Sequence, residues 1–329
     1  ASVKGGRQGF EVGTNHEGPA AVAGLRQCRQ MSPPRWPAGG VAPRTGGTSV
    51  STRHNLRRSD KQRLLIRAIV GRLLQTSNEK GVIMKCVPKI NAPYWFCLML
   101  ASIFGANAGD FLSDVLDLGH VSGIPYLAVA LLAVFGGERL ARRPSALWFW
   151  AAIIIIRASA TNVGDAFHDF DIGFDLSLPV VAVLPVVAVV AWRLMAPPPR
   201  GRGFVPVEGF YWVTMFLAGV FGTVAGDAAS YAVGLGNFWA MVAFAAPLAV
   251  LFVAGRHGLL TELAYYWLVV AVIRSAGTAA GDLWAHSPFG LEDGTAVSAV
   301  VFVAAVLALY VLSDRNRRTQ VAALPAVAS

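Results

Sequence analysis

The sequence contains few charged residues for its length, and this scarcity excludes an ordinary soluble domain. Asp, Glu, Lys and Arg make up 14% of the 329 residues, whereas soluble domains contain about 25%. The hydrophobic fraction is 55% and the mean hydropathy is +0.52. We therefore expect a membrane protein whose main partner is the lipid bilayer.

Cysteine is also scarce. The three cysteines, Cys28, Cys86 and Cys97, show no Cys-x-x-Cys or comparable metal-ligand spacing. The histidines show no metal-ligand spacing either, and no nucleophile stands beside an evident base. We predict no disulfide framework, no cofactor and no enzymatic activity, and the composition leaves the binding of a metal ion open.

Basic residues are sparse in the apolar part of the chain. Residues 1–90 contain 16 Lys and Arg against 4 Asp and Glu, and residues 91–329 contain 12 against 15. The net charge of +9 therefore belongs to the N-terminal segment and predicts no nucleic-acid partner. Residues 1–83 are rich in Gly, Pro, Arg and Ser, so we expect a disordered basic extension that is either upstream translation or dispensable.

Long apolar runs fill the rest of the sequence. A membrane-spanning helix needs about 20 apolar residues, with about 17 as the lower limit. Eight runs meet this length: 94–117, 121–138, 146–169, 178–195, 209–232, 237–254, 263–286 and 295–312. We predict an all-α protein of eight transmembrane helices, with residues 84–200 and 201–314 as its two halves and 315–329 as a cytoplasmic tail.

A Gly-Asp pair stands near the end of each odd-numbered run, and a Trp precedes each Asp by fifteen residues. The carboxylates are Asp110, Asp165, Asp227 and Asp282, and the tryptophans are Trp95, Trp150, Trp212 and Trp267. The first and third motifs, like the second and fourth, are 117 residues apart without a gap. This spacing predicts four two-helix repeats that enter the membrane in the same direction, with pseudo-symmetry about the membrane normal.

The distribution of charge predicts the orientation. Arginines occupy the loops between pairs of runs, whereas the connections within pairs contain acidic residues and no Lys or Arg. Because basic residues are retained on the cytoplasmic side, we expect both termini in the cytoplasm of a bacterial cell and the protein in its inner membrane. The four tryptophans are then expected to be interfacial anchors.

The motif carboxylates define the candidate site. An Asp sixteen residues into a helix lies about 24 Å along it, in the outer third of a core about 30 Å thick. A lone carboxylate there costs about 2.5–3.5 kcal/mol, so we expect the four to face a shared polar interior. Neighbouring polar residues are assigned to the same site: Asn107, Asn162, Thr161, Thr223, Thr278, Arg157 and Arg274. Asp114, Asp117 and Asp169 are predicted to extend it as an outer acidic vestibule, because Asp110, Asp114 and Asp117 would share one helical face.

Small residues around the motif predict close helix crossings. The glycines concerned are Gly105, Gly109, Gly164, Gly222, Gly226, Gly277 and Gly281. Two functional interpretations stay open. The carboxylates form the site of a transporter of a cation or small polar solute, or Asp and Arg form structural pairs in a non-transporting scaffold or accessory protein. The oligomeric state is not set by the sequence.

Two runs of sequence resemble a known family. The stretch from Glu208 to Asp227 and the stretch from Tyr266 to Asp282 are similar to bacterial membrane proteins built from four copies of a repeat of unknown function. The resemblance spans about residues 84–312 and implies topology without an activity. The family's first copy reads Thr-Thr-x-Gly-Glu-x-x-x-Asp, where this chain has Ser102 to Asp110 and Ala106 in place of the glutamate. If that glutamate helps to bind a cation, this protein binds one differently or not at all.

Overall fold

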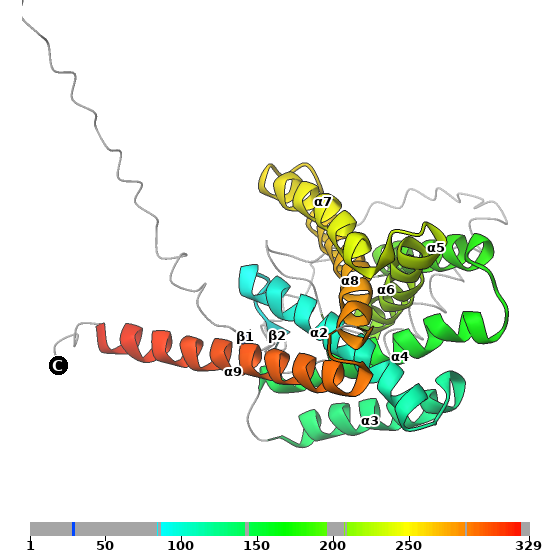
Figure 1. Cartoon of the computed structure of the whole chain (residues 1–329). Helices are drawn as coiled ribbons and strands as arrows, with labels where there is room; N and C mark the ends of the chain where they lie inside the picture. The colour runs from blue at the N-terminus through cyan, green and yellow to red at the C-terminus, as the bar shows by residue number, and fades with distance from the viewer. Residues whose placement is uncertain are drawn as a thin grey trace, which may run out of the picture.

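The computed structural model describes residues 28–29, 84, 87–141, 145–195, 207, 209–286 and 288–323. Apart from Cys28–Arg29, the predicted N-terminal extension lies outside the described residues. Cys28–Arg29 is the short strand β1, which pairs antiparallel with β2(Val87–Pro88). The described part of the chain is otherwise helical (Figure 1).

Eight helical segments are long and apolar enough to cross a membrane, which confirms the predicted number. In chain order they are α2(Ala92–Asp110) with the π-helical turn η2(Phe111–Val115), α3(His120–Leu140), α4(Ala146–Asp169), α5(Phe174–Met195), α6(Gly209–Asp227) with the π-helical turn η3(Ala228–Ala232), α7(Gly236–Arg256), α8(Glu262–His286) and α9(Leu291–Ala323). The apolar part of α9 ends at Leu312, although the helix continues through the first residues of the predicted tail.

Capping residues mark where two of these helices begin. The side chain of Asn91 accepts a hydrogen bond from the backbone nitrogen of Tyr94, and Pro93 stands in the first turn of α2. Proline is favoured there because the first helical amides have no partner within the helix. Ser145 caps α4 in the same way by accepting from Leu147. These caps fix where the first two repeats begin their inner helices.

The helices form an inner group and an outer group. More than half of the apolar window is buried in α2, α4, α6 and α8, whereas less than a fifth is buried in α3, α5, α7 and α9. The inner helices contact one another in the cyclic order α2, α4, α6, α8 and back to α2. The two predicted halves of the membrane domain are therefore parts of one closed bundle.

Each outer helix packs mainly against the inner helix of the following repeat. The pairs are α3 with α4, α5 with α6, α7 with α8, and α9 with α2 (Figure 1). The last pair joins the final repeat to the first, so the four units close into a ring. This arrangement confirms the all-α fold with four two-helix units around one axis.

A ring of aromatic side chains gives the most direct measure of that symmetry. Its members, one from each inner helix, are Tyr94, Phe149, Tyr211 and Tyr266. The centroids of neighbouring rings are 6.2–6.3 Å apart all the way round. Each of these rings also lies 5.4–5.8 Å from the motif Trp of the next repeat.

The motif tryptophans are therefore not the interfacial anchors that the sequence suggested. Trp95, Trp150, Trp212 and Trp267 are 4–8% exposed and belong to the main hydrophobic core. The prediction was wrong because each indole packs against the aromatic ring of the neighbouring unit, a contact between repeats that spacing along one helix cannot reveal.

Candidate functional site

The four motif carboxylates lie at one end of the inner bundle and form what we call the carboxyl ring: Asp110, Asp165, Asp227 and Asp282. Each of the four interacts electrostatically with the other three. Asp110 and Asp165 are among these interacting pairs, although they stand on different inner helices, α2 and α4. The structure thus brings together the carboxylates that the sequence motif singled out.

The carboxyl ring is not completely buried. Asp227 is 7% exposed, and the other three carboxylates are half-buried. Among the described residues, no group of three or more His, Cys, Asp or Glu side chains is arranged to hold a metal ion. The four carboxylates therefore share one region without forming a compact metal cage.

The backbone around the ring follows the 117-residue relation between repeats. Directly after Asp110 and Asp227, the chain forms the π-helical turns η2 and η3, whereas α4 and α8 continue as regular helices past Asp165 and Asp282. Such π-helical turns occur frequently at functional sites. First and third repeats thus present their carboxylates differently from second and fourth.

Arg157 lies immediately below the carboxyl ring and is completely buried. Its Nη1 donates to Thr161 Oγ1 at 2.7 Å and to Thr223 Oγ1 at 2.8 Å, and its Nη2 donates to Thr278 Oγ1 at 2.6 Å. Its Nε donates to Ser102 Oγ at 3.3 Å. One guanidinium group therefore links all four inner helices through hydroxyl groups.

Arg274 occupies the equivalent position in the fourth repeat but points the other way. It is also completely buried, and its Nη2 donates to Met215 Sδ at 3.2 Å. Met215 stands twelve residues before Asp227, on the side away from the carboxyl ring, whereas the three threonine partners of Arg157 lie towards it. The two guanidinium groups repel each other electrostatically, which favours opposite directions for two equal charges at one membrane depth.

The arginines differ in how completely they are satisfied. Among the described residues, neither forms an ion pair within 4.0 Å. Arg157 uses Nε, Nη1 and Nη2, whereas Nε and Nη1 of Arg274 have no hydrogen-bond partner. The carboxyl ring still interacts electrostatically with Arg157 over a longer distance.

The axis below the arginines is closed by two further layers. The first is apolar and fully buried, and it consists of Leu98, Ile153, Met215 and Val270. The second is the aromatic ring, in which Tyr266 Oη lies 2.6 Å from Tyr94 Oη and 2.9 Å from Tyr211 Oη. Successive layers are four residues apart along each inner helix, so they occupy successive helical turns.

The hydroxyl layer around Arg157 lacks a fourth member. Thr161, Thr223 and Thr278 each stand four residues before a motif Asp, and the matching residue of the first repeat is Ala106, which is 1% exposed. This is the position at which the resembling family has glutamate. Ala106 offers no ligand, so the first repeat contributes only Ser102 to the contacts of Arg157.

The two predicted asparagines lie between helices rather than among the hydrogen-bonding partners of Arg157. Both are completely buried, and neither amide group has a hydrogen-bond partner within the described residues. Asn107 Oδ1 lies 2.6 Å from where a Cβ on Gly281 would stand, and Asn162 Oδ1 lies 3.0 Å from the same point on Gly109. Each asparagine therefore faces the inner helix of the preceding repeat.

The predicted outer vestibule is only partly formed. His120, at the start of α3, has Nδ1 2.8 Å from Asp169 Oδ2 and Nε2 3.9 Å from Asp114 Oδ1. Asp117 follows the end of η2 with a φ of 54°. The expectation of one helical face running from Asp110 to Asp117 was therefore wrong, because it assumed a regular α-helix where the chain forms a π-helical turn and then a left-handed residue.

The motif glycines lie where the inner helices approach most closely. A Cβ on Gly222 would overlap Arg274 Cβ and lie 2.7 Å from its carbonyl carbon, and one on Gly164 would lie 2.6 Å from Thr223 Cγ2. The remaining positions meet the neighbouring inner helix in the same way: Gly105, Gly109, Gly226, Gly277 and Gly281. Only a residue without a Cβ fits these helix crossings without displacement.

Sequence reasoning missed three features of the site: the tyrosine hydroxyl cluster, the bond between Ser102 and Arg157, and the role of His120 as a link between repeats. The cluster had a visible signal, since Tyr or Phe directly precedes every motif Trp. Ser102 also had one, because it stands 55 residues before Arg157 at the same place in its repeat. His120 had none.

The fold and the site define a polytopic helical membrane protein assembled from repeated pairs of helices. Residues 93–143 and 265–319 match the family model described as a Repeat of Unknown Function (DUF347). The two matched segments lie in the first and fourth units, which confirms the resemblance to a repeat-built membrane family of unknown function. No curated protein and no solved structure matches the chain.

Proposed function

We propose that this protein transports a small cation or small polar solute and that the carboxyl ring is its binding site. The observation that carries the proposal is the convergence of Asp110, Asp165, Asp227 and Asp282 from four separate helices. Carboxylates are costly at membrane depth and mark ion or substrate pathways when they face a shared interior. Four of them in one ring provide oxygen ligands for a cation or a protonated amine.

The acidic residues around the ring support entry from the outer side. Asp114 and Asp169 stand at the same end of the bundle with side chains 59% and 47% exposed. Clustered charge of one sign raises the local concentration of oppositely charged solutes. A cation would thus be concentrated at the mouth before it reaches the ring.

The closed axis supports a transporter mechanism over a permanently open pore. A cation leaving the ring inward would meet the guanidinium group of Arg157, then the buried apolar layer and the aromatic ring. Fixed positive charge in a pore repels cations. Passage therefore requires rearrangement of the repeats, and protonation of a ring carboxylate would couple that rearrangement to the proton gradient.

Flux through purified protein in proteoliposomes tests the proposal. A panel of divalent cations, protons and small amines is offered from the acidic side, and uptake is compared for wild type, Asp110→Asn and Asp227→Asn. Loss of one charged contact of about 1.5–3 kcal/mol predicts at least a tenfold fall in uptake. Asp117→Asn is the matched control, since this exposed carboxylate lies outside the ring. Equal flux in the ring variants and the wild type would contradict the proposal.

A non-transporting scaffold is the second candidate, and the contacts of Arg157 favour it. The single buried side chain of Arg157 bonds hydroxyl groups from all four repeats, so it could serve only to hold the four repeats together. In that case no member of the solute panel would raise the melting temperature of the wild type in detergent. Ligand-dependent stabilisation that disappears in Asp227→Asn would favour the transporter instead.

We also assign the protein to the bacterial inner membrane, with the arginine-bearing ends of the helices in the cytoplasm. Arg139, Arg193 and Arg256 stand in the last turns of α3, α5 and α7, at the end where the inner helices begin. Retention of basic residues on the cytoplasmic side supports this orientation. Labelling of single cysteines placed beside Arg193 and beside Asp171 with a membrane-impermeant thiol reagent tests it, and labelling of the first site in intact cells would contradict it.

A further inference from the structure

A groove opens on the flank of the bundle at the arginine-bearing end. It has a volume of about 660 Å³ and lies between the start of α2, the end of α7 and α8. Its apolar lining comes from Trp95, Phe96, Met99, Leu248, Phe252 and Ile273. The volume falls within the range of about 300–1,000 Å³ typical of pockets that hold small molecules.

The groove faces the region that lipid occupies. Phe96, which lines the groove, is 59% exposed. Lipid tails, rather than water, contact such surfaces at the depth of a membrane-spanning helix. An occupant of the groove is therefore in direct exchange with the bilayer.

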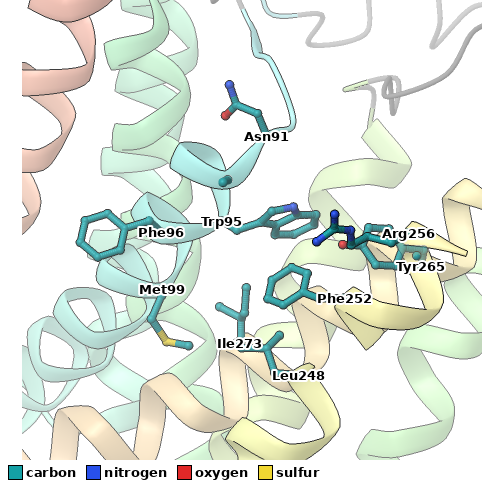
Figure 2. A pocket seen from close by; sticks show the side chains of 11 residues that line it. Asn91, Trp95, Phe96, Met99, Leu248, Phe252, Arg256, Tyr265 and Ile273 are labelled. Atoms are coloured by element: carbon teal, nitrogen blue, oxygen red, sulfur yellow. The ribbon is translucent and has the colours of Figure 1, made fainter. Parts of the chain in front are cut away.

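Polar groups gather at one end of the groove only. Arg256, the last residue of α7, is exposed and forms no ion pair with any described residue. Figure 2 shows Trp95 and Arg256 reaching toward each other from α2 and α7, with Asn91 above them. The groove thus combines an apolar slot with an exposed cation at its mouth, at the level where a helix meets the membrane surface.

Tight packing holds the cationic end in place. A Cβ on Gly255 would overlap the ring of Tyr265, so the end of α7 lies directly on α8. Tyr265 lies 6.1 Å from Trp95 between ring centroids, in an edge-to-face arrangement. Arg256 therefore projects from a fixed helix end next to fixed aromatic walls.

We propose that the groove binds an anionic phospholipid from the adjacent leaflet, with an acyl chain in the apolar slot and the phosphate against Arg256. The argument is charge complementarity: an arginine without an ion-pair partner among the described residues can bind phosphate with paired N–H donors, and basic residues at the cytoplasmic surface attract anionic lipids. A zwitterionic lipid would fill the slot equally well, but the cationic group beside its phosphate would weaken its attraction to Arg256.

Native mass spectrometry of the full-length protein tests the proposal. The protein in detergent is mixed with equal, limiting amounts of phosphatidylglycerol and phosphatidylcholine of the same chain length. We expect the wild type to retain one phosphatidylglycerol preferentially. Arg256→Gln should reduce that preference about fivefold, the effect of one basic residue near an anionic surface.

Arg193→Gln is the matched control, since Arg193 is an exposed arginine in the last turn of α5 and does not line the groove. An equal loss of preference in both variants would overturn the proposal, because it would reveal general surface attraction. Leu248→Trp places a larger side chain in the slot and should reduce retention of both lipids. Unchanged lipid retention in Leu248→Trp would also overturn the proposal. So would a dimer of the wild type that Leu248→Trp abolishes, because a second copy of the chain would then occupy the groove.

Discussion

The opposite directions of the two buried arginines predict opposite effects of the same substitution. Arg157→Met removes four hydrogen bonds to hydroxyls on all four inner helices. It also removes the positive charge nearest to the carboxyl ring. Hydrogen bonds to charged groups contribute about 1.5–3 kcal/mol each, but such contributions do not add fully. Loss of one partner from a buried charged network costs about 3–5 kcal/mol, which is the destabilisation expected here.

Arg274→Met should behave differently although it is the symmetry-related change. Two of the three guanidinium nitrogens of Arg274 have no partner, and the third contacts only the sulfur of Met215. Replacement of a poorly satisfied buried charge by an apolar side chain of similar volume is neutral or stabilising by about 1–4 kcal/mol. It also removes the repulsion between Arg274 and Arg157.

Equilibrium unfolding in mixed micelles, followed by tryptophan fluorescence, measures both changes. The exposed Arg193 supplies the control, since Arg193→Met should change the free energy of unfolding by less than about 0.5 kcal/mol. A loss in Arg274→Met as large as that in Arg157→Met would refute the assignment of partners. It would mean that both arginines are anchored equally well.

Two further perturbations follow from the packing of the inner helices, each measured by the same unfolding experiment. Gly222→Ala should lower the free energy of unfolding by about 1–3 kcal/mol, because the new methyl group would overlap Arg274. At Gly136 no atom lies within 4 Å, so Gly136→Ala should raise it by about 0.5–1 kcal/mol through helix propensity. A change of the same sign in both variants would contradict the close helix crossing at Gly222. Tyr211→Phe removes a buried hydroxyl hydrogen bond and should lower the free energy of unfolding by about 0.5–1.5 kcal/mol. Tyr310→Phe, on the exposed side of α9, is the control and should change it by less than about 0.5 kcal/mol. Equal effects of the two substitutions would argue against the hydroxyl cluster.

The sequence alone determined the number of spans, the division into four units and the positions of the motif carboxylates. Hydrophobic length predicts membrane helices because each must satisfy its backbone within the bilayer. The constant distance from Trp to Asp predicted equal depth for Asp110, Asp165, Asp227 and Asp282. Periodicity of this kind depends on one helix at a time, so a single sequence contains it completely.

Contacts between units were decided only by the tertiary structure. Arg157 and Arg274 occupy equivalent positions in the sequence repeats, yet Arg157 bonds three threonine hydroxyls towards the carboxyl ring and Arg274 points away from it. That difference depends on repulsion between two charges brought to the same axis, and no local signal encodes it. The burial of the motif tryptophans has the same origin, since each contacts the aromatic ring of another repeat. The path of the chain after Asp110 was likewise fixed by a π-helical turn, which changes the direction of the acidic face that helical periodicity predicted.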